Sequence, residues 1–443
     1  MTYDAKTLQD WDDRYVWHPF TPHSVYREEE PLTIVAGEGN YLIDVHGARY
    51  LDGVASIWCN TFGHRRREID DAIRAQLDRV AHATMLGNAS APAIQLAKRI
   101  VDFAPPGLDK VFFSDNGSTA SEIALKMAYQ YMQQTGRTQR SRFMALGNAY
   151  NGDTIGAVSV GGVDLFHARF RPMLFEVVRA PSPYRYRDPD TDHIAEFERI
   201  FRENAAQLVA VVIEPGMQGA GGMITYPPGY LRRVRELCDE LDVLLVFDEV
   251  AMGMGRSGKM FASQTEGVTP DFLCIAKGLT GGYLPVAATI TRSAIFDGFL
   301  GRPEEGRTFF HGHTYTGNAL GCAAALATLD IFENDDVIAG LQPKIDHLRR
   351  ELERLWAFPV VGDIRQYGLA VGIELVADRG SKEPFDAAER RGYRVCRHAR
   401  DRGVFLRPLG DVLVLMPPLS ITTAEITTLV DAVAHGITRE FEV

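Results

Sequence analysis

The sequence predicts an α/β fold built on a mostly parallel sheet. Three continuous apolar runs, at residues 208–213, 243–247 and 272–276, lack the polar alternation of a half-exposed strand. Such runs are typical of strands that are buried on both faces. Residues 231–241, between the first two runs, repeat apolar side chains at helical spacing. This alternation of buried strand and amphipathic helix indicates a parallel sheet with helical connections.

The chain before these runs predicts a hairpin and then alternating helices and strands. Two short apolar runs that flank a glycine-containing turn indicate the hairpin, at residues 37–52. Apolar residues at helical spacing and short β-type runs indicate the other elements: helices at 69–80, 91–103 and 123–131, and strands at 111–113 and 143–146.

The pattern of predicted elements changes after about residue 330. A long polar-rich helix is predicted at 337–358, followed by strands at 370–376 and 412–416 and helices at 387–402 and 423–441. These elements indicate a smaller α+β domain. We expect residues 65–330 to form the large domain that carries the cofactor, and the small domain to combine residues 1–64 with residues 331–443.

The composition excludes several classes of protein. The chain has 443 residues, of which 46% are hydrophobic, so it can bury a large core and is not intrinsically disordered. A net charge of −11 argues against a nucleic-acid partner. No apolar run approaches the roughly 20 residues that span a bilayer, and residues 1–13 do not resemble a secretory signal. We therefore expect a cytoplasmic protein with no membrane contact.

Neither a disulfide framework nor a metal site is expected. The five cysteines are far apart and form no CxxC pair. His64, His311 and His313 show no metal-ligand spacing with acidic neighbours.

Three polar residues directly follow the apolar runs, namely Glu214, Asp248 and Lys277. Ligands of parallel sheets bind beyond the carboxyl ends of the strands. A lysine in surroundings that lower its pKa can form a Schiff base with the aldehyde of pyridoxal 5'-phosphate (PLP), and a carboxylate can hold the pyridine nitrogen of PLP protonated. Taken alone, these two residues are better explained without a cofactor, with Asp248 as a helix cap and Lys277 as a solvated loop residue.

Residues 115–119, Asp-Asn-Gly-Ser-Thr, lie between a predicted strand and a predicted helix. The N–H groups of Gly117 and Ser118 at a helix N-terminus would suit a phosphate group. The alternative is an ordinary helix cap formed by Ser118 or Thr119. Asn116-Gly117-Ser118 also matches the pattern of a glycosylation acceptor. Glycosylation is not expected, because no secretory signal is seen.

The glycine-rich segment 253–259, Gly-Met-Gly-Arg-Ser-Gly-Lys, matches two nucleotide-binding patterns. However, Met260 occupies the position where a P-loop has Ser or Thr, and the five residues 248–252 separate Phe247 at the strand end from Gly253, the first residue of the pattern. A nucleotide site here is therefore the weaker interpretation.

Several further residues are candidates for contacts with a cofactor or substrate. Tyr150 follows a predicted strand and would suit stacking on a planar ring. Phe20 and Trp58 would suit an apolar pocket wall, and Arg407 would suit a substrate carboxylate. The alternatives are a core or surface aromatic for the first three and a surface ion pair for Arg407.

Together these residues resemble the class III PLP-dependent aminotransferases along almost the whole chain. Asp248-Glu249-Val250, the glycine segment 253–259, and Lys277, 29 residues after Asp248, match that family's ordered motifs. The resemblance explains the glycines as a structural loop. Within the family, four segments are most similar to the branch that aminates 7-keto-8-aminopelargonate in biotin synthesis: Trp17-His18-Pro19-Phe20-Thr21, residues 216–222, residues 310–318 and Arg407-Pro408-Leu409-Gly410.

The resemblance implies a fold-type I PLP-dependent transferase that works as a homodimer. It implies that Lys277 forms the Schiff base and shuttles a proton, that Asp248 holds the pyridine N–H and that Glu214 supports the cofactor. Further implied roles are phosphate contacts by Gly117 and Ser118, a phosphate contact by Thr314 in the partner subunit's site, ring stacking by Tyr150, and substrate contacts by Phe20, Trp58, Tyr150, Gly312 and Arg407.

The chain departs from the family's pattern at several positions. Asn151 and Met254 stand where His and Phe are common. Ile57, Phe20 and His313 differ from members that use S-adenosylmethionine as the amino donor, so lysine stays open as the donor. The resemblance implies amination of 7-keto-8-aminopelargonate to 7,8-diaminopelargonate. The closest alternative is an amine or ω-amino acid:pyruvate transaminase.

Overall fold

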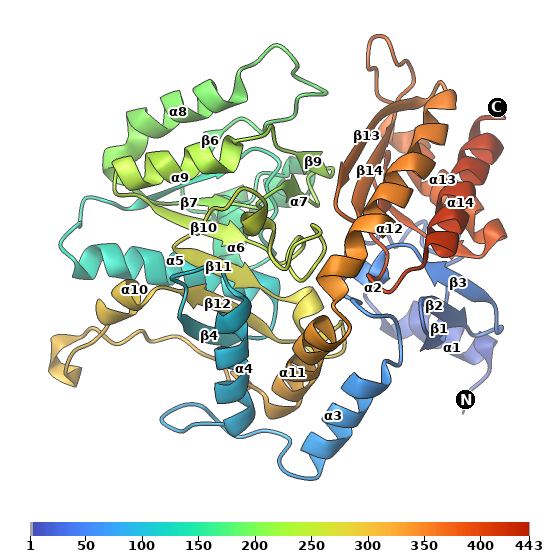
Figure 1. Ribbon diagram of the computed structural model, residues 1–443. Coiled ribbons are helices and arrows are strands. Elements are labelled where there is room, and N and C mark those ends of the chain that lie inside the picture. Colours follow the sequence, from blue (N-terminus) through green and yellow to red (C-terminus); the bar gives the residue numbers. More distant parts are fainter. Residues whose placement is uncertain (1–2, 443) are drawn as a thin grey trace.

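The computed structural model describes residues 3–442 and is built around a seven-stranded sheet (Figure 1). β11, β10, β7, β5 and β6 pair in parallel, while β12 runs antiparallel to both β11 and β4. The α/β fold with a mostly parallel sheet is therefore confirmed. In sheet order the strands are β4 (Lys110–Ser114), β12 (Ala287–Thr291), β11 (Phe272–Ile275), β10 (Leu244–Asp248), β7 (Leu208–Ile213), β5 (Arg142–Leu146) and β6 (Val177–Ala180).

Both faces of this sheet are buried, which explains the continuous apolar runs of its strands. In β10, Leu244 and Val246 pack into a cluster with α5 (Gly117–Gln134). Leu245 and Phe247 pack into the opposite cluster, with α4 (Ala91–Phe103), α8 (His193–Asn204) and α9 (Tyr230–Glu240). Because side chains alternate along a strand, Asp248 continues the row that faces α5.

The carboxyl ends of the parallel strands lie at one edge of the sheet, and the connections that leave this edge carry the polar residues. β4 leads into α5, β10 ends at Asp248, and β11 leads into the short helix η4 (Lys277–Thr280). The sequence did not predict the reversed strand β12, whose five residues are all buried, as are those of the parallel strand β10.

Two smaller four-stranded sheets lie beside the large one, and both chain ends are on that side of the molecule (Figure 1). The predicted hairpin is present as β2 (Tyr41–Asp44) and β3 (Arg49–Asp52), with β1 (Ile34–Glu38) added at one edge. β15 (Val404–Phe405) pairs in parallel with β3, so the N-terminal sheet includes a C-terminal strand. The other sheet contains β13 (Val361–Tyr367), β14 (Ala370–Leu375), β17 (Val412–Leu415) and β16 (Arg407–Leu409).

The remaining helices mostly match the predicted ranges. The predicted helix at 69–80 is α3 (Arg67–Leu77), and those near the C-terminus are α12 (Val337–Leu352), α13 (Arg391–His398) and α14 (Thr423–Phe441). Elements that were not predicted include α1 (Ala5–Tyr15), α2 (Ala55–Trp58), α6 (Ile155–Val160), α7 (Asp164–His167), α10 (Ser293–Asp297), α11 (Ala319–Asn334), β8 (Met217–Gln218) and β9 (Ile224–Thr225). Across residues 3–442, no helix has the length and apolar character needed to span a bilayer.

Candidate active site

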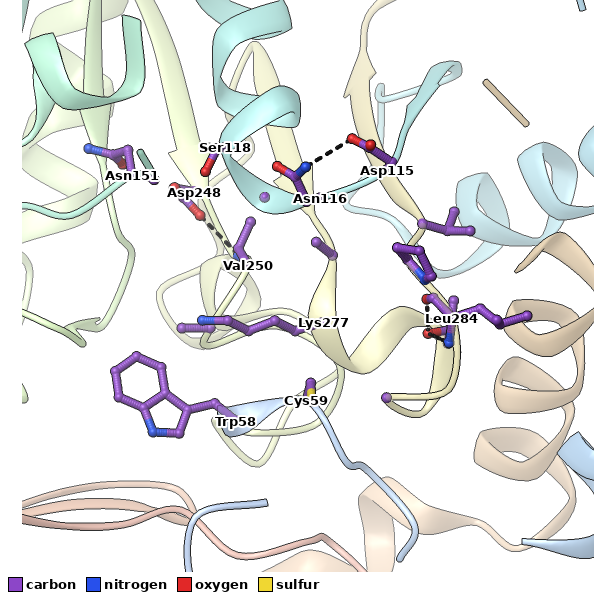
Figure 2. Close-up of a pocket in the computed structure, with 18 of the residues that line it drawn as sticks. Trp58, Cys59, Asp115, Asn116, Ser118, Asn151, Asp248, Val250, Lys277 and Leu284 are labelled. Atoms are coloured by element: carbon purple, nitrogen blue, oxygen red, sulfur yellow. Dashed lines mark hydrogen bonds between the residues drawn. The ribbon is translucent and has the colours of Figure 1, made fainter. Parts of the chain in front are cut away.

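A cavity of about 430 Å³ opens at the carboxyl edge of the large sheet (Figure 2). Its wall combines strand ends with a segment from the N-terminal part of the chain. The lining residues used below are Trp58, Gly117, Ser118, Tyr150, Asn151, Glu214, Asp248, Val250 and Lys277. Residues separated by more than 200 positions thus meet in one place.

Lys277 extends into this cavity between Asp248 and Trp58 (Figure 2). Its Nζ lies 4.6 Å from the centre of the Trp58 ring. Burial lowers the pKa of Lys277, and the nearby Asp248 and Glu214 carboxyls oppose this shift. A lowered pKa increases the fraction of neutral amine, which is the nucleophilic form.

Asp248 is 5% exposed and has a hydrogen-bond donor on each carboxylate oxygen. The Val250 N–H donates to Oδ1 over 3.0 Å, and the Ser121 hydroxyl donates to Oδ2 over 3.2 Å. Burial raises the pKa of Asp248 to about 6, while both donors and the Lys277 charge act in the opposite direction. The group can therefore be an anion at neutral pH.

Glu214 lines the same wall and holds two loops. Its oxygens accept hydrogen bonds from the N–H groups of Tyr150 and Gly219, both over 2.9 Å. Burial and the Asp248 charge raise the pKa of Glu214 to about 8, whereas the two N–H donors lower it. The role of Glu214 in the structure is thus to fix the backbone around the cavity.

The N-terminus of α5 forms another part of the wall. Asn116 caps this helix, because its side chain accepts from the Thr119 N–H over 3.0 Å. The cap is therefore not Ser118 or Thr119. The first N–H groups of a helix have no carbonyl partner within it, so those of Gly117 and Ser118 are suited to an anion. A Cβ atom on Gly117 would lie only 2.6 Å from Cγ1 of Val250, so a larger residue would force Val250 to move.

Tyr150 and Asn151 line the cavity next to the helix N-terminus. The Tyr150 hydroxyl donates to Asp153 over 2.8 Å, and its ring makes an edge contact with Phe166. Asn151 is buried, and neither polar atom of its amide has a partner within the described part of the chain. The sequence marked Asn151 only as a departure from the family's pattern, yet it offers a free donor and acceptor in the cavity wall.

Four predicted site residues do not line this cavity in the single chain: Phe20, Gly312, Thr314 and Arg407. Phe20 is 54% exposed and contacts Phe166, which in turn contacts Tyr150. The backbone carbonyl of Thr314 lies 2.7 Å from a ring nitrogen of His82. Arg407 is exposed on β16.

The glycine segment 253–259 is packed against the C-terminal part of the chain. Arg256 is buried and donates hydrogen bonds to the backbone carbonyls of Leu369 and Pro417. A Cβ atom on Gly255 would lie 2.6 Å from a methyl carbon of Leu419. Lys259 is exposed and lies outside the cavity.

The cavity offers the groups that PLP requires. Lys277 provides an amine for the aldehyde, Asp248 a carboxylate for the pyridine nitrogen, and the start of α5 free N–H groups for the phosphate. The unpartnered amide of Asn151 leaves a further polar contact for a ligand. The residues present therefore fit this cofactor.

Comparison with known proteins agrees with this geometry. Residues 24–437 match the aminotransferase class-III family. The chain is 54% identical to an adenosylmethionine-8-amino-7-oxononanoate aminotransferase of Geobacter sulfurreducens, over 98% of both chains. The crystal structure of the protein of that name from Methanocaldococcus jannaschii superposes with a TM-score of 0.96 at 48% identity, over 98% of this chain and 99% of the other.

A second solved structure belongs to a protein with a different name. An amine transaminase from an uncultivated Pseudomonas species, in its PLP-bound form, superposes with a TM-score of 0.92 at 38% identity. The match covers 96% of this chain and 98% of the other. Because the family match spans nearly the whole chain and the cavity presents the amine, carboxylate and anion site that PLP needs, this protein belongs to the class III aminotransferases, which are PLP-dependent enzymes.

Proposed function

We propose that this enzyme transfers an amino group to 8-amino-7-oxononanoate (7-keto-8-aminopelargonate), giving 7,8-diaminopelargonate for biotin synthesis. The observation that carries the proposal is identity of 46–54%, over 97–99% of this chain, to five relatives that all bear the same name. The donor is S-adenosylmethionine or lysine.

The lining residues would have separate roles in cofactor binding and proton transfer. PLP supplies an aldehyde that bonds to amines and a ring that accepts electrons from a neighbouring carbon. Lys277 would bind that aldehyde and then move a proton through its Nζ atom. Asp248 would accept a hydrogen bond from the pyridine N–H, and Tyr150 would stack near the ring. Gly117 and Ser118 would bind the phosphate.

Glu214 and the remaining candidates would act around this centre. Glu214 would hold the loops that carry Tyr150 and Gly219, as its two hydrogen bonds indicate. Trp58 and Phe20 would line the substrate pocket together with Gly312, and Arg407 would bind the substrate carboxylate. The part of the chain formed by residues 1–64 and 331–443 would close over the substrate as a small domain.

The active enzyme would be a homodimer with shared active sites. Thr314 does not line its own chain's cavity, and the neighbouring Phe310 and Tyr315 are 84% and 62% exposed. Two large aromatic side chains exposed in one segment support an interface there. In the dimer this segment would place Thr314 against the phosphate bound by the other subunit.

The decisive experiment is a half-reaction with 7,8-diaminopelargonate as the only substrate. We expect this amine to change the visible absorbance of the PLP-loaded enzyme rapidly and to release 8-amino-7-oxononanoate. The donor is then identified by adding S-adenosylmethionine or lysine alone. An absorbance that does not respond to 7,8-diaminopelargonate would reject the proposed substrate.

The second candidate function is an amine:pyruvate transaminase, which the similarity to the Pseudomonas amine transaminase favours. It predicts that phenylethylamine or β-alanine changes the same absorbance, and that pyruvate restores it. This result without a response to 7,8-diaminopelargonate would select the alternative.

A further inference from the structure

We propose that Ser121 is a positioning residue that keeps the Asp248 carboxylate oriented and ionised. This inference rests on the proposed role of Asp248 as the partner of the cofactor's pyridine nitrogen. Neither the sequence motifs nor the similarity to other proteins draws attention to Ser121, because it lies on a helix and not at a strand end.

The sheet register places Asp248 directly under α5. Asp248 is aligned with Cys274 on β11, and Cys274 is aligned with Thr289 on β12. Aligned residues of neighbouring strands share a face of the sheet. Cys274 and residues of α5 belong to one apolar cluster, so this row of three side chains faces the helix.

Each polar group in this row has its own partner. The Cys274 thiol and the Thr289 hydroxyl both donate to the Ala120 carbonyl, over 3.5 and 2.8 Å. The Ser121 hydroxyl donates to Asp248 Oδ2. A helical serine commonly bonds a carbonyl one turn back in its own helix. Ser121, which is 2% exposed, bonds across to the sheet instead.

The Ser121 bond orients the carboxylate. Val250 N–H binds Oδ1, and Ser121 binds Oδ2 from the opposite element. Two donors on different oxygens oppose rotation of the carboxylate about its bond to Cβ. In residues 3–442, Ser121 is the one side chain that donates a hydrogen bond to Asp248.

The Ser121 bond also affects the charge of Asp248. Burial is the largest influence and favours the protonated form, whereas the Ser121 hydroxyl favours the anion. The titratable groups that interact electrostatically with Asp248 are Lys277, which favours the anion, the buried carboxyls Glu214 and Glu249, and the normally neutral Tyr150 and Cys274. A protonated Asp248 would offer a donor where the pyridinium needs an acceptor.

The test compares Ser121→Val with Ser121→Thr, since valine and threonine have the same shape and differ in the hydroxyl. The probe is pyridoxamine 5'-phosphate, which has no aldehyde to react with Lys277. Its Kd for the apoenzyme is measured from pH 5 to 8.5 by equilibrium dialysis. Titration of the probe itself is the same for every variant and cancels in the comparison.

We expect the affinity of the unaltered enzyme for the probe to decrease at low pH, because Asp248 becomes protonated near pH 6. The pH at which this decrease begins is called the break. A hydrogen bond to a charged group is strong enough to move this break by about one pH unit, which is about fivefold in Kd at pH 6 and approaches about tenfold at pH 5. Ser121→Val should therefore raise the break by about one unit, and Ser121→Thr should leave it close to pH 6.

The matched control is Ser159→Ala, which removes another buried hydroxyl, one that donates to the Ile155 carbonyl outside the cavity. It should leave the break unchanged. Equal breaks for Ser121→Val and Ser121→Thr would overturn the role of Ser121. If the valine variant does not fold, the breaks of Ser121→Ala and Ser159→Ala are compared instead. A raised break in Ser121→Ala alone supports the role of Ser121, and equal breaks overturn it.

Failure of the proposed role of Asp248 gives a different result. Asp248→Asn should lack the break that Asp248 causes and keep only the pH dependence that comes from the probe. If the unaltered enzyme shows the same pH profile as Asp248→Asn, Asp248 does not hold the pyridine nitrogen, and the inference about Ser121 fails with it.

Discussion

The Nζ of Lys277 lies 4.6 Å from the centre of the Trp58 ring, and both residues have left-handed backbones, with φ of 44° and 67°. Such backbones cost about 1–3 kcal/mol each for residues other than glycine, and they persist where the surrounding structure imposes them. The contact joins a strand end of the large sheet to the N-terminal segment. It gives the N-terminal segment a direct influence on the amine.

Replacing Trp58 by leucine should lower the pKa of Lys277 further. An aromatic face stabilises an ammonium by about 0.5–1 kcal/mol, which corresponds to less than about one pH unit. Trp58→Phe keeps an aromatic face and should shift the pKa less. The measurement is the pH dependence of the rate at which the apoenzyme combines with PLP. An upward shift in the leucine variant would contradict the prediction.

Lys277→Ala should abolish the covalent attachment of PLP and reduce turnover by about 10²–10⁴-fold or more, since the variant lacks both the amine and the proton-transfer group. Borohydride reduction followed by mass spectrometry detects the attachment site. The control is Lys259→Ala, because Lys259 is exposed in the glycine segment. Loss of attachment in the control, or retention in Lys277→Ala, would identify a different lysine.

Glu214 should make the stability of the apoenzyme depend on pH. Its pKa in the folded protein is raised from 4.5 to about 8, so the folded state binds its proton more tightly than the unfolded state does. The stabilising contribution is present below about pH 4.5 and is lost as the pH rises to 8. Glu214→Gln loses one hydrogen-bond acceptor at every pH but should show a smaller fall in Tm over this range. A parallel fall in both proteins would mean that Glu214 does not titrate there.

Gly117→Ala should weaken PLP binding, because the added Cβ would lie 2.6 Å from Cγ1 of Val250. Overpacking of this kind typically costs about 1–3 kcal/mol. The double variant Gly117→Ala with Val250→Ala should recover much of the lost Tm and affinity, while Val250→Ala alone should not strengthen binding. If the second substitution recovers nothing, the clash is not the cause.

The proposed shared active site predicts complementation between two inactive variants. In a hybrid dimer of Lys277→Ala and Thr314→Ala chains, one site has both an intact Lys277 and an intact Thr314. Random mixing should therefore restore roughly a quarter of the activity, since half of the dimers are hybrids with one intact site. Activity is assayed at limiting PLP after unfolding and refolding the mixture. No recovery in a mixture that refolds as dimers would show that Thr314 does not act across the interface.

The sequence by itself determined the class of fold and the position of the main polar residues. Continuous apolar runs specify strands that are buried on both faces, and this is a local property of composition and spacing. Glu214, Asp248 and Lys277 each follow such a run, and the carboxyl ends of parallel strands meet at one edge of the sheet. Their convergence on one cavity therefore follows from the order of residues along the chain.

Other features were decided only by the tertiary structure. The hydrogen bond from Ser121 to Asp248 joins residues 127 positions apart and depends on how α5 packs against the aligned strands. The reversal of β12 leaves no trace in its burial pattern, because all five of its residues are buried, as they are in the parallel strand β10. The glycine segment fits a nucleotide loop by pattern, and only the burial of Arg256 against distant carbonyls shows where it packs. Contacts of this kind depend on the register and packing of separate elements, which no short stretch of sequence specifies.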